Sequence, residues 1–433
     1  MSLATLIEGM LGSDLPVGLR AYDGTHVGPP DPAATIVVKS PDAVARIVQA
    51  PGELGFARAY VAGDIDIEGD VFAALQVRDA LPDIKLTPQQ WIYAARLIGR
   101  SGFRRVPPPP EEARLRGRRH TPARDRVAVS YHYDVSNDFY RLVLGRTMTY
   151  SCGAWTDASI GLDQAQANKY DLICRKLDLE PGQHLLDVGC GWGGMVMHAA
   201  SCCGVDAVGI TLSARQQEWA AKAIADAGLG SSVQARVQDY RDVQDGPYDA
   251  ASSIGMFEHV GLARLRQYFD CLYRLLRPGG RLLNHGISRQ PRPSNNRPRS
   301  WPSPLPKLPP GRRGTGTRTG FKRDSFIDRY VFPDGELHEV GAVISVMQDV
   351  GFEVRHVESL REHYGLTLRA WVANLEANWD AAVRAAGPRR ARVWRLYMAA
   401  SALNFEAGRT AIHQVLAVKR DGGRSGLPLR PGF

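Results

Sequence analysis

The sequence contains no long hydrophobic run. None of its apolar stretches, in a chain of 433 residues, approaches the roughly 20 residues that a membrane-spanning helix needs. The segment from Met1 to Leu11 has no basic region before its short apolar stretch, which is not the pattern of a secretory signal. We therefore expect a cytoplasmic protein, and an apolar content of 44% is sufficient for ordinary buried cores.

Cysteine is also scarce, with six residues at positions 152, 174, 190, 202, 203 and 271. These residues form no Cys-x-x-Cys pair and no metal-type grouping with histidine. Glu258-His259 lacks the His-Glu-x-x-His spacing of a zinc site. We therefore expect reduced thiols, no disulfide and no metal site.

Acidic residues are rare in two segments whose positive charge exceeds the net charge of +9 of the whole chain, so the remainder of the chain is mildly acidic. Residues 104–126 carry eight arginines and three acids, and residues 289–323 carry ten Lys or Arg and no acid. Such clusters attract nucleic acid or anionic lipid headgroups, and charge alone does not choose between them. A solvated linker is the alternative interpretation of each segment.

The residue pattern divides the chain into three parts. Residues 1–103 are expected to form a small α/β domain, with strands at 34–39 and 63–69 and a helix at 41–50. Residues 104–124, which include the run from Pro107 to Pro110, are expected to form a basic linker. Residues 125–433 are expected to form the main domain.

Strands alternate with helices in the main domain, which predicts an α/β fold with a parallel sheet covered on both faces. The expected strands are 184–188, 207–210, 233–237, 248–254, 281–285, 352–358 and 412–418, and the expected helices are 195–203, 213–227, 263–276 and 338–350. Further helical stretches are expected between 125 and 179, and a helical block at 366–407 is placed to form a lid. Pro278-Gly279-Gly280 predicts a sharp stop before the strand at 281, and residues 289–323, with eight prolines, predict a mobile basic loop.

The strand at 184–188 runs into an acidic residue and a glycine-rich turn, Asp187-Val188-Gly189-Cys190-Gly191-Trp192-Gly193. Glycines let the main chain turn tightly and come close to a ligand. A dinucleotide site would have Gly-x-Gly-x-x-Gly and an acid about 20 residues further on, and this chain has neither. The pattern favours S-adenosylmethionine as the ligand, with a dinucleotide site and a turn without ligand as the alternatives.

Eight segments occur in one order along the main domain. They are Tyr131–Tyr140, Thr149–Cys152, the glycine turn, Thr211–Ser213 with Gln216, Gln238–Asp242, Met256–Gly261, His285–Ile287 and His363–Tyr364. Together they resemble the cyclopropane-fatty-acyl-phospholipid synthase family, which includes mycolic acid cyclopropane synthases and enzymes that place a methylene or methyl branch on fatty acids. The resemblance implies a Rossmann-like class I methyltransferase sheet with a helical lid, and a lipid-associated N-terminal domain.

The resemblance also implies which residues bind the cofactor S-adenosylmethionine. They are Tyr150, Ser151, Asp187, Gly189, Gly191, Thr211, Gln216, Asp239 and Tyr240. Asp187 and the glycines match the turn under the methionine, Thr211 and Gln216 match the ribose region, and Asp239 with Tyr240 matches the adenine edge. Ordinary core packing is the alternative for Tyr240.

The reaction implied is methyl transfer to an isolated carbon–carbon double bond, followed by proton loss from a carbocation. In the family a bicarbonate ion removes this proton. The matching positions that hold the ion are Cys152, Glu258, His285, Ile287 through its main chain, and Tyr364. Hydrogen-bond donors and a carboxylate acceptor suit such an ion. Purely structural roles are the alternatives, as a buried thiol for Cys152, a core histidine for His285 and a surface tyrosine for Tyr364.

Two departures leave the product open between a cyclopropane and a methylene-branched chain, which a partner reductase could convert to a methyl branch. Gly286 stands where many family members have Thr, and the stretch 289–323 is unusually long. We expect a phospholipid substrate, an anionic membrane surface on the inner face as partner, a possible homodimer and no nucleic acid, because the Asn/Asp-Pro-Pro-Tyr/Phe motif is missing after the strand at 248–254. A methyltransferase for a small soluble acceptor and a non-catalytic lipid- or nucleic-acid-binding protein are the alternatives.

Overall fold

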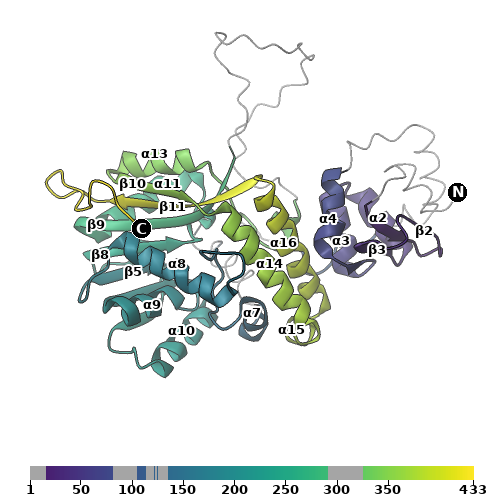
Figure 1. Cartoon of the computed structure of the whole chain (residues 1–433), viewed down its shortest axis with the longest axis horizontal. Coiled ribbons are helices and arrows are strands. Elements are labelled where there is room, and N and C mark those ends of the chain that lie inside the picture. Colours follow the sequence, from purple (N-terminus) through teal and green to yellow (C-terminus); the bar gives the residue numbers. More distant parts are fainter. Residues whose placement is uncertain (1–15, 81–104, 114–120, 122–123, 125–134, 291–324) are drawn as a thin grey trace, which may run out of the picture.

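The computed structural model describes residues 16–80, 105–113, 121, 124, 135–290 and 325–433. Within these residues two separate sheets are present, one built from residues 18–69 and the other from strands between residues 184 and 418 (Figure 1). No helix in the described part of the chain combines the length and apolarity needed to cross a membrane.

The first sheet has four short strands in the order β2-β1-β3-β4. Its strands are β1 (Gly18–Arg20), β2 (His26–Val27), β3 (Ala34–Val38) and β4 (Ile65–Gly69), and its helices are α2 (Pro41–Gln49), α3 (Glu53–Ala62) and α4 (Val71–Ala80). The predicted strands at 34–39 and 63–69 and the helix at 41–50 are confirmed as β3, β4 and α2. The sequence pattern missed α3 and α4, whose hydrophobic and polar residues do not separate into clear faces.

The second sheet has seven strands in the order β10-β11-β9-β8-β5-β6-β7. They are β5 (His184–Val188), β6 (Asp206–Thr211), β7 (Val233–Val237), β8 (Tyr248–Ile254), β9 (Leu276–Arg289), β10 (Glu353–Ser359) and β11 (Thr410–Val418). Strand β11 pairs antiparallel with both of its neighbours, β10 and β9, and the other pairs in this sheet are parallel. The predicted α/β fold class is therefore confirmed.

Helices cover both faces of the large sheet, as Figure 1 shows. One layer contains α8 (Leu162–Leu177), α9 (Gly194–Cys203) and α10 (Ala214–Asp226), and the other contains α11 (Leu262–Leu275) and α13 (Val340–Val350). Leu185 packs in the core with α8 and α9, whereas its neighbour Leu186 packs in the core with α11 and α13. Successive strand residues point to opposite faces, so an apolar strand such as β5 supplies both cores.

Two predicted boundaries are wrong. Strand β9 begins at Leu276, directly after α11, so Pro278-Gly279-Gly280 lies inside the strand and does not precede it. The strand also extends to Arg289, which was assigned to the loop, and most of that loop lies outside the described residues. Pairing with both β8 and β11 extends the strand beyond what local propensity predicts.

The helical block between β10 and β11 consists of α14 (Arg361–Ala377), α15 (Trp379–Ala386) and α16 (Pro388–Glu406). These helices pack with α7 (Asn137–Leu144), and α16 also packs against α3 and α4 (Figure 1). Arg392 donates to the carbonyl oxygens of Tyr60 and Ile65, at 3.3 Å each, and Arg395 donates to the Tyr60 hydroxyl at 3.1 Å. The N-terminal unit and the helical block therefore share one hydrophobic core.

Part of the segment predicted as a basic linker is packed into the protein. Val106, Glu112 and Ala113 are buried. Glu112 accepts hydrogen bonds from Arg58, at 2.9 and 2.8 Å, and from the Tyr330 hydroxyl at 3.3 Å. Tyr330 is the last residue of α12 (Phe326–Tyr330), which follows β9 in the chain. The buried carboxylate of Glu112 therefore connects the N-terminal unit with α12. Residues 114–120 and 122–123 lie outside the described residues.

Replacing Glu112 by alanine is expected to lower the free energy of unfolding by about 3 kcal/mol, because Arg58 would stay partly buried without its partner. Urea denaturation of the full chain measures this change. Glu218→Ala, an exposed acid on α10, is the matched control. Equal loss in both variants would contradict the proposed structural role of Glu112.

Candidate active site

A pocket opens at the carboxyl ends of β5, β6 and β8, where ligands bind in open α/β sheets. Its lining includes every residue that the resemblance assigns to the cofactor: Tyr150, Ser151, Asp187, Gly189, Gly191, Thr211, Gln216, Asp239 and Tyr240. The fold thus brings these residues together from widely separated segments, and their individual roles as ligands stay predictions.

The glycine turn joins β5 to α9 with a left-handed backbone. The φ angles are 83° at Gly189, 54° at Gly191 and 88° at Gly193. Side chains rarely tolerate this region. In addition, a Cβ atom on Gly193 would lie 3.1 Å from the Cβ of Ala220 on α10. The three glycines are therefore required by the turn itself and by the close approach of α10.

The acid before the turn is buried beneath the pocket. Asp187 is 2% exposed, and its Oδ1 accepts a hydrogen bond of 2.6 Å from the Ser252 hydroxyl on β8. Burial raises the pKa of Asp187 to about 6, against the opposing effects of Ser252 and Lys169. The carboxylate is therefore charged at neutral pH and suited to a cationic group in the pocket.

The opposite end of the pocket holds Thr211, Gln216, Asp239 and Tyr240. The Thr211 hydroxyl donates to Gln216 Oε1 at 2.7 Å, and Asp239 accepts from Arg241 Nε at 2.8 Å. The ring of Tyr240 packs edge-on against Tyr268, with centroids 4.9 Å apart. Tyr240 therefore belongs both to the pocket wall and to the core, so the alternative of core packing describes part of its role.

Of the residues assigned to the proton-removing site, four are buried and Ile287 is half-buried, and none of them lines this pocket. Glu258 lies in a short 3-10 helix (Phe257–His259) after β8, and its Oε1 accepts from the Ile287 N–H at 2.6 Å. His285 Nδ1 lies 3.3 Å from Gln414 Nε2. Glu258 Oε2 and His285 Nε2 are buried and have no hydrogen-bond partner among the described residues.

Cys152 and Tyr364 share a partner, Leu360, at the start of α14. The Cys152 sulfur lies 3.7 Å from the carbonyl oxygen of Leu360, which also accepts from the Tyr364 N–H at 3.1 Å. Burial raises the pKa of the Cys152 thiol, so it stays protonated and can donate a hydrogen bond. The structure therefore shows two contacts within this group. Glu258 binds the main chain of Ile287, and Cys152 contacts the first turn of α14, which carries Tyr364.

Burial shifts the titration of two of these groups in opposite directions. It raises the pKa of Glu258 to about 7, with the Ile287 N–H opposing this change. It lowers the pKa of His285 well below its usual value, helped by Lys169 and Lys176. Strand β9 thus carries a neutral imidazole at His285 and, two residues further on, the Ile287 N–H that binds a carboxyl group exchanging protons near neutral pH.

Gly286 has a packing role in the structure. A Cβ atom at this position would lie 1.8 Å from Cε1 of Phe257. The glycine therefore makes room for the Phe257 ring, whose neighbour in the chain is Glu258. This departure from the family pattern is explained by packing at the site itself.

Sequence reasoning missed many residues of the pocket wall, among them Lys169. This lysine of α8 is fully buried, and its Nζ donates to the Ser151 hydroxyl at 2.9 Å and lies 4.0 Å from the Tyr170 ring centroid. Desolvation lowers the pKa of Lys169 to about 7. The signal was present in the sequence, because Lys169 shares the inward face of an amphipathic helix with Ala165 and Ile173.

A glycine turn after the first strand of a seven-stranded sheet, a buried acid beneath it and a pocket at the strand ends define the class of S-adenosylmethionine-dependent methyltransferases. A family profile described as mycolic acid cyclopropane synthetase matches residues 120–415. The chain belongs to this family.

The similar proteins agree with this assignment. A probable fatty acid methyltransferase of Mycobacterium tuberculosis is 44% identical over 100% of this chain and 98% of its own length. The cyclopropane-fatty-acyl-phospholipid synthase of Escherichia coli is 31% identical over 88% of this chain and 87% of its own length. Among solved structures, the mycolic acid cyclopropane synthase CmaA1 complexed with SAH and CTAB is 32% identical, with a TM-score of 0.59 over 68% of this chain and 98% of that chain.

Replacing Lys169 by methionine is expected to stabilise the protein by a few kcal/mol at pH 6, and the gain should shrink as the pH rises toward 10. The pKa of Lys169 is about 7 in the folded chain and near the usual 10.5 when unfolded, so folding of the natural protein releases a proton between these values. Chemical denaturation at several pH values measures the difference. Lys222→Met, an exposed lysine on α10, should show no such pH trend, and a constant difference for Lys169→Met would contradict the assignment.

Proposed function

We propose that this protein transfers the methyl carbon of S-adenosylmethionine to the double bond of an unsaturated acyl chain in a membrane phospholipid. Membership of the family, together with relatives named for fatty acid methylation and cyclopropane formation, supports the substrate class. The observation that carries the proposal is the combination of an aromatic wall along the cofactor pocket with a buried acid, Glu258, beside it.

The aromatic wall connects the pocket with the helical block. Tyr150 and Trp192 line the pocket, and Tyr140 packs on both, with centroid distances of 6.0 and 4.8 Å. Tyr150 also packs against Trp371 and Trp394, at 5.2 and 5.4 Å. An alkene is a weak nucleophile, so the enzyme must hold it dry and close to the methyl group. Aromatic faces also stabilise the positive charge of the cofactor and of the carbocation that follows.

Proton loss from the carbocation is assigned to the buried cluster of Glu258 and His285. Their unpartnered atoms, Glu258 Oε2 and His285 Nε2, offer an acceptor and a ring nitrogen that suit a bicarbonate ion, together with the Cys152 thiol and Tyr364. When bound, the ion would supply a small base that can reach the cation. The Ile287 N–H is engaged by Glu258, so in this arrangement it orients the carboxylate and does not contact the ion. Glu258 then accepts the proton and passes it to solvent.

The fate of the carbocation decides the product. Loss of a proton from the added carbon with ring closure gives a cyclopropane, whereas a hydride shift before proton loss gives a methylene-branched chain. Phe257 packs against Gly286 directly beside Glu258 in the chain, and we propose that this packing influences the choice. A partner reductase belongs to the proposal only for the methylene product, and a homodimer remains a prediction.

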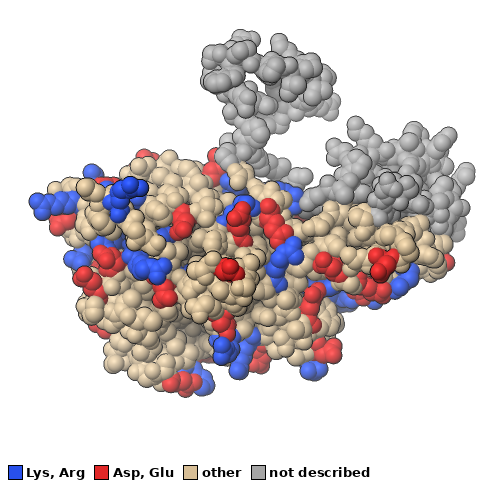
Figure 2. All heavy atoms as spheres, in the orientation of Figure 1, with Lys and Arg blue, Asp and Glu red and all other residues tan. Residues whose placement is uncertain are grey.

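Docking on an anionic bilayer is assigned to the two basic segments, which lie largely outside the described residues. On the face shown in Figure 2, the Lys and Arg of the described residues are interspersed with Asp and Glu. This agrees with the sequence, in which the excess positive charge belongs to residues 104–126 and 289–323. Each Lys or Arg near an anionic surface contributes about 1 kcal/mol, and salt weakens this attraction.

Incubation with S-adenosylmethionine carrying a deuterated methyl group and dioleoyl phosphatidylglycerol vesicles is expected to label the acyl chains. Mass spectrometry of the released fatty acids should find two deuteriums on the added carbon, since one is lost as the proton, and ring or methylene signals identify the product. Label only in a water-soluble acceptor, or none with cofactor bound, would contradict the lipid substrate. Equal incorporation into neutral and anionic vesicles would contradict electrostatic docking.

Replacing Glu258 by glutamine is expected to lower kcat by about a hundredfold to ten-thousandfold, because the amide cannot accept the proton. In the natural protein the rate should rise with pH through about 7, as the Glu258 carboxyl group loses its proton, and this rise should vanish in Glu258→Gln. Glu218→Gln is the control. A variant that keeps the pH-dependent rise would rule out Glu258 as the titrating group.

A further inference from the structure

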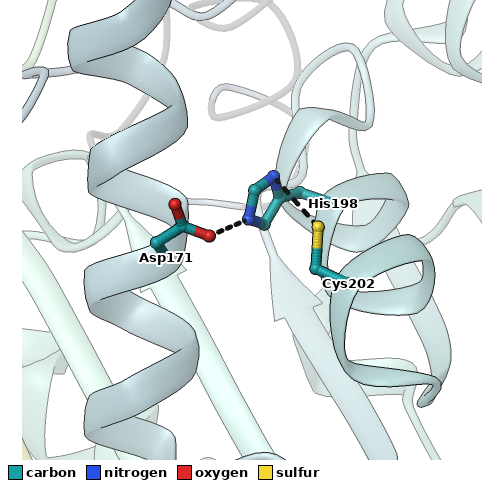
Figure 3. A group of neighbouring side chains, drawn as sticks. All are labelled: Asp171, His198 and Cys202. Atoms are coloured by element: carbon teal, nitrogen blue, oxygen red, sulfur yellow. Dashed lines mark hydrogen bonds and ion pairs between the residues drawn. The ribbon is translucent and has the colours of Figure 1, made fainter.

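A second group of chemically reactive side chains lies on the outer layer of the large sheet, between α8 and α9. Asp171 comes from α8, and His198 and Cys202 come from successive turns of α9 (Figure 3). A carboxylate oxygen, a ring nitrogen and the sulfur of these residues lie within 4.8 Å of one another. None of the three lines the cofactor pocket.

The histidine is oriented by the carboxylate. His198 Nε2 lies 2.8 Å from Asp171 Oδ1, and the other ring nitrogen, Nδ1, faces the Cys202 sulfur at 4.0 Å, as Figure 3 shows. A carboxylate that fixes a histidine ring through one nitrogen is the usual support of a metal-binding imidazole. Nitrogen and sulfur bound to one tetrahedral zinc ion lie roughly 3.6 Å apart, so a small closure brings Nδ1 and the sulfur to that separation.

The position on the helix favours a cation. Helix α9 ends at Cys203, so Cys202 lies in its last turn, where the helix dipole is negative. Cys202 is exposed and the Asp171 side chain is 46% exposed, so an ion can enter and water can complete its coordination. Imidazole and thiolate together suit borderline-soft ions of the Zn²⁺ type.

We propose that Asp171, His198 and Cys202 form a binding site for one thiophilic divalent metal ion of the Zn²⁺ class. His198 Nδ1 and Cys202 Sγ are the ligands, and Asp171 holds the imidazole ring. The expectation that no cysteine groups with a histidine is therefore wrong here, because His198 and Cys202 are four residues apart on one helix face.

Two further thiols close to the cluster provide the competing explanation. The pKa of Cys174 is raised by burial and by its interaction with Cys203, so these two cysteines lie in contact. A metal bound by Cys174 and Cys203 would not need His198. Cys203→Ser is therefore the matched control for Cys202→Ser, since the two cysteines are adjacent in the chain.

The test uses the full chain, reduced and freed of metal by a chelator, with Co²⁺ as the probe and Zn²⁺ as the competitor. A thiolate-to-cobalt absorption band should reach saturation at one ion per chain and disappear on addition of Zn²⁺. Cys202→Ser should abolish the band, His198→Gln should weaken binding at least tenfold, and Asp171→Asn should weaken it by about tenfold to a hundredfold. Cys203→Ser should bind as the natural protein does.

Absence of the band in the natural protein would overturn the proposal. Loss of the band in Cys203→Ser with retention in Cys202→Ser or His198→Gln would also overturn it, and would assign binding to the other thiols. Titration of each variant with S-adenosylmethionine verifies that the fold is intact, because the cluster lies outside the cofactor pocket.

Discussion

The left-handed turn between β5 and α9 is the constraint on which the site depends. Three glycines with positive φ carry the chain over Asp187 and bring α9 and α10 close to the sheet. Any other residue at these positions would strain the backbone, and at Gly193 a Cβ atom would also press on Ala220 of α10. The turn contributes Gly189 and Gly191 to the lining of the cofactor pocket, and Met256 lies in van der Waals range of a Cβ placed on Gly189.

The N-terminal unit supports the opposite side of the site. Arg392 and Arg395 on α16 bind its backbone and Tyr60, and the other face of α16 contributes Trp394 to the aromatic wall. Glu112 and Tyr330 make a second connection between distant parts of the chain. The wall that would hold an acyl chain is therefore fixed by residues from both ends of the protein.

Burial away from water shifts the pKa values of the ionisable groups at the site. Asp187, Lys169 and Glu258 all have pKa values displaced toward neutrality by burial, while His285 is kept uncharged. In the proposed mechanism the same dry environment would protect a carbocation from water and strengthen the interaction of the protein with the positively charged cofactor. One property of the fold would thus serve both cofactor binding and the proposed proton transfer.

The sequence by itself determined the alternation of strands and helices and the glycine turn, because hydrophobic periodicity and glycine spacing are local properties. The family came from the resemblance of eight ordered segments. That resemblance also pointed to nine of the residues that line the pocket. Only the tertiary structure decided that Glu112 is buried in a segment that reads as a linker, that β9 passes through Pro278, and that Lys169 faces the pocket. These features depend on neighbours distant in the chain, which supply the ion pairs, strand partners and burial that no local pattern encodes.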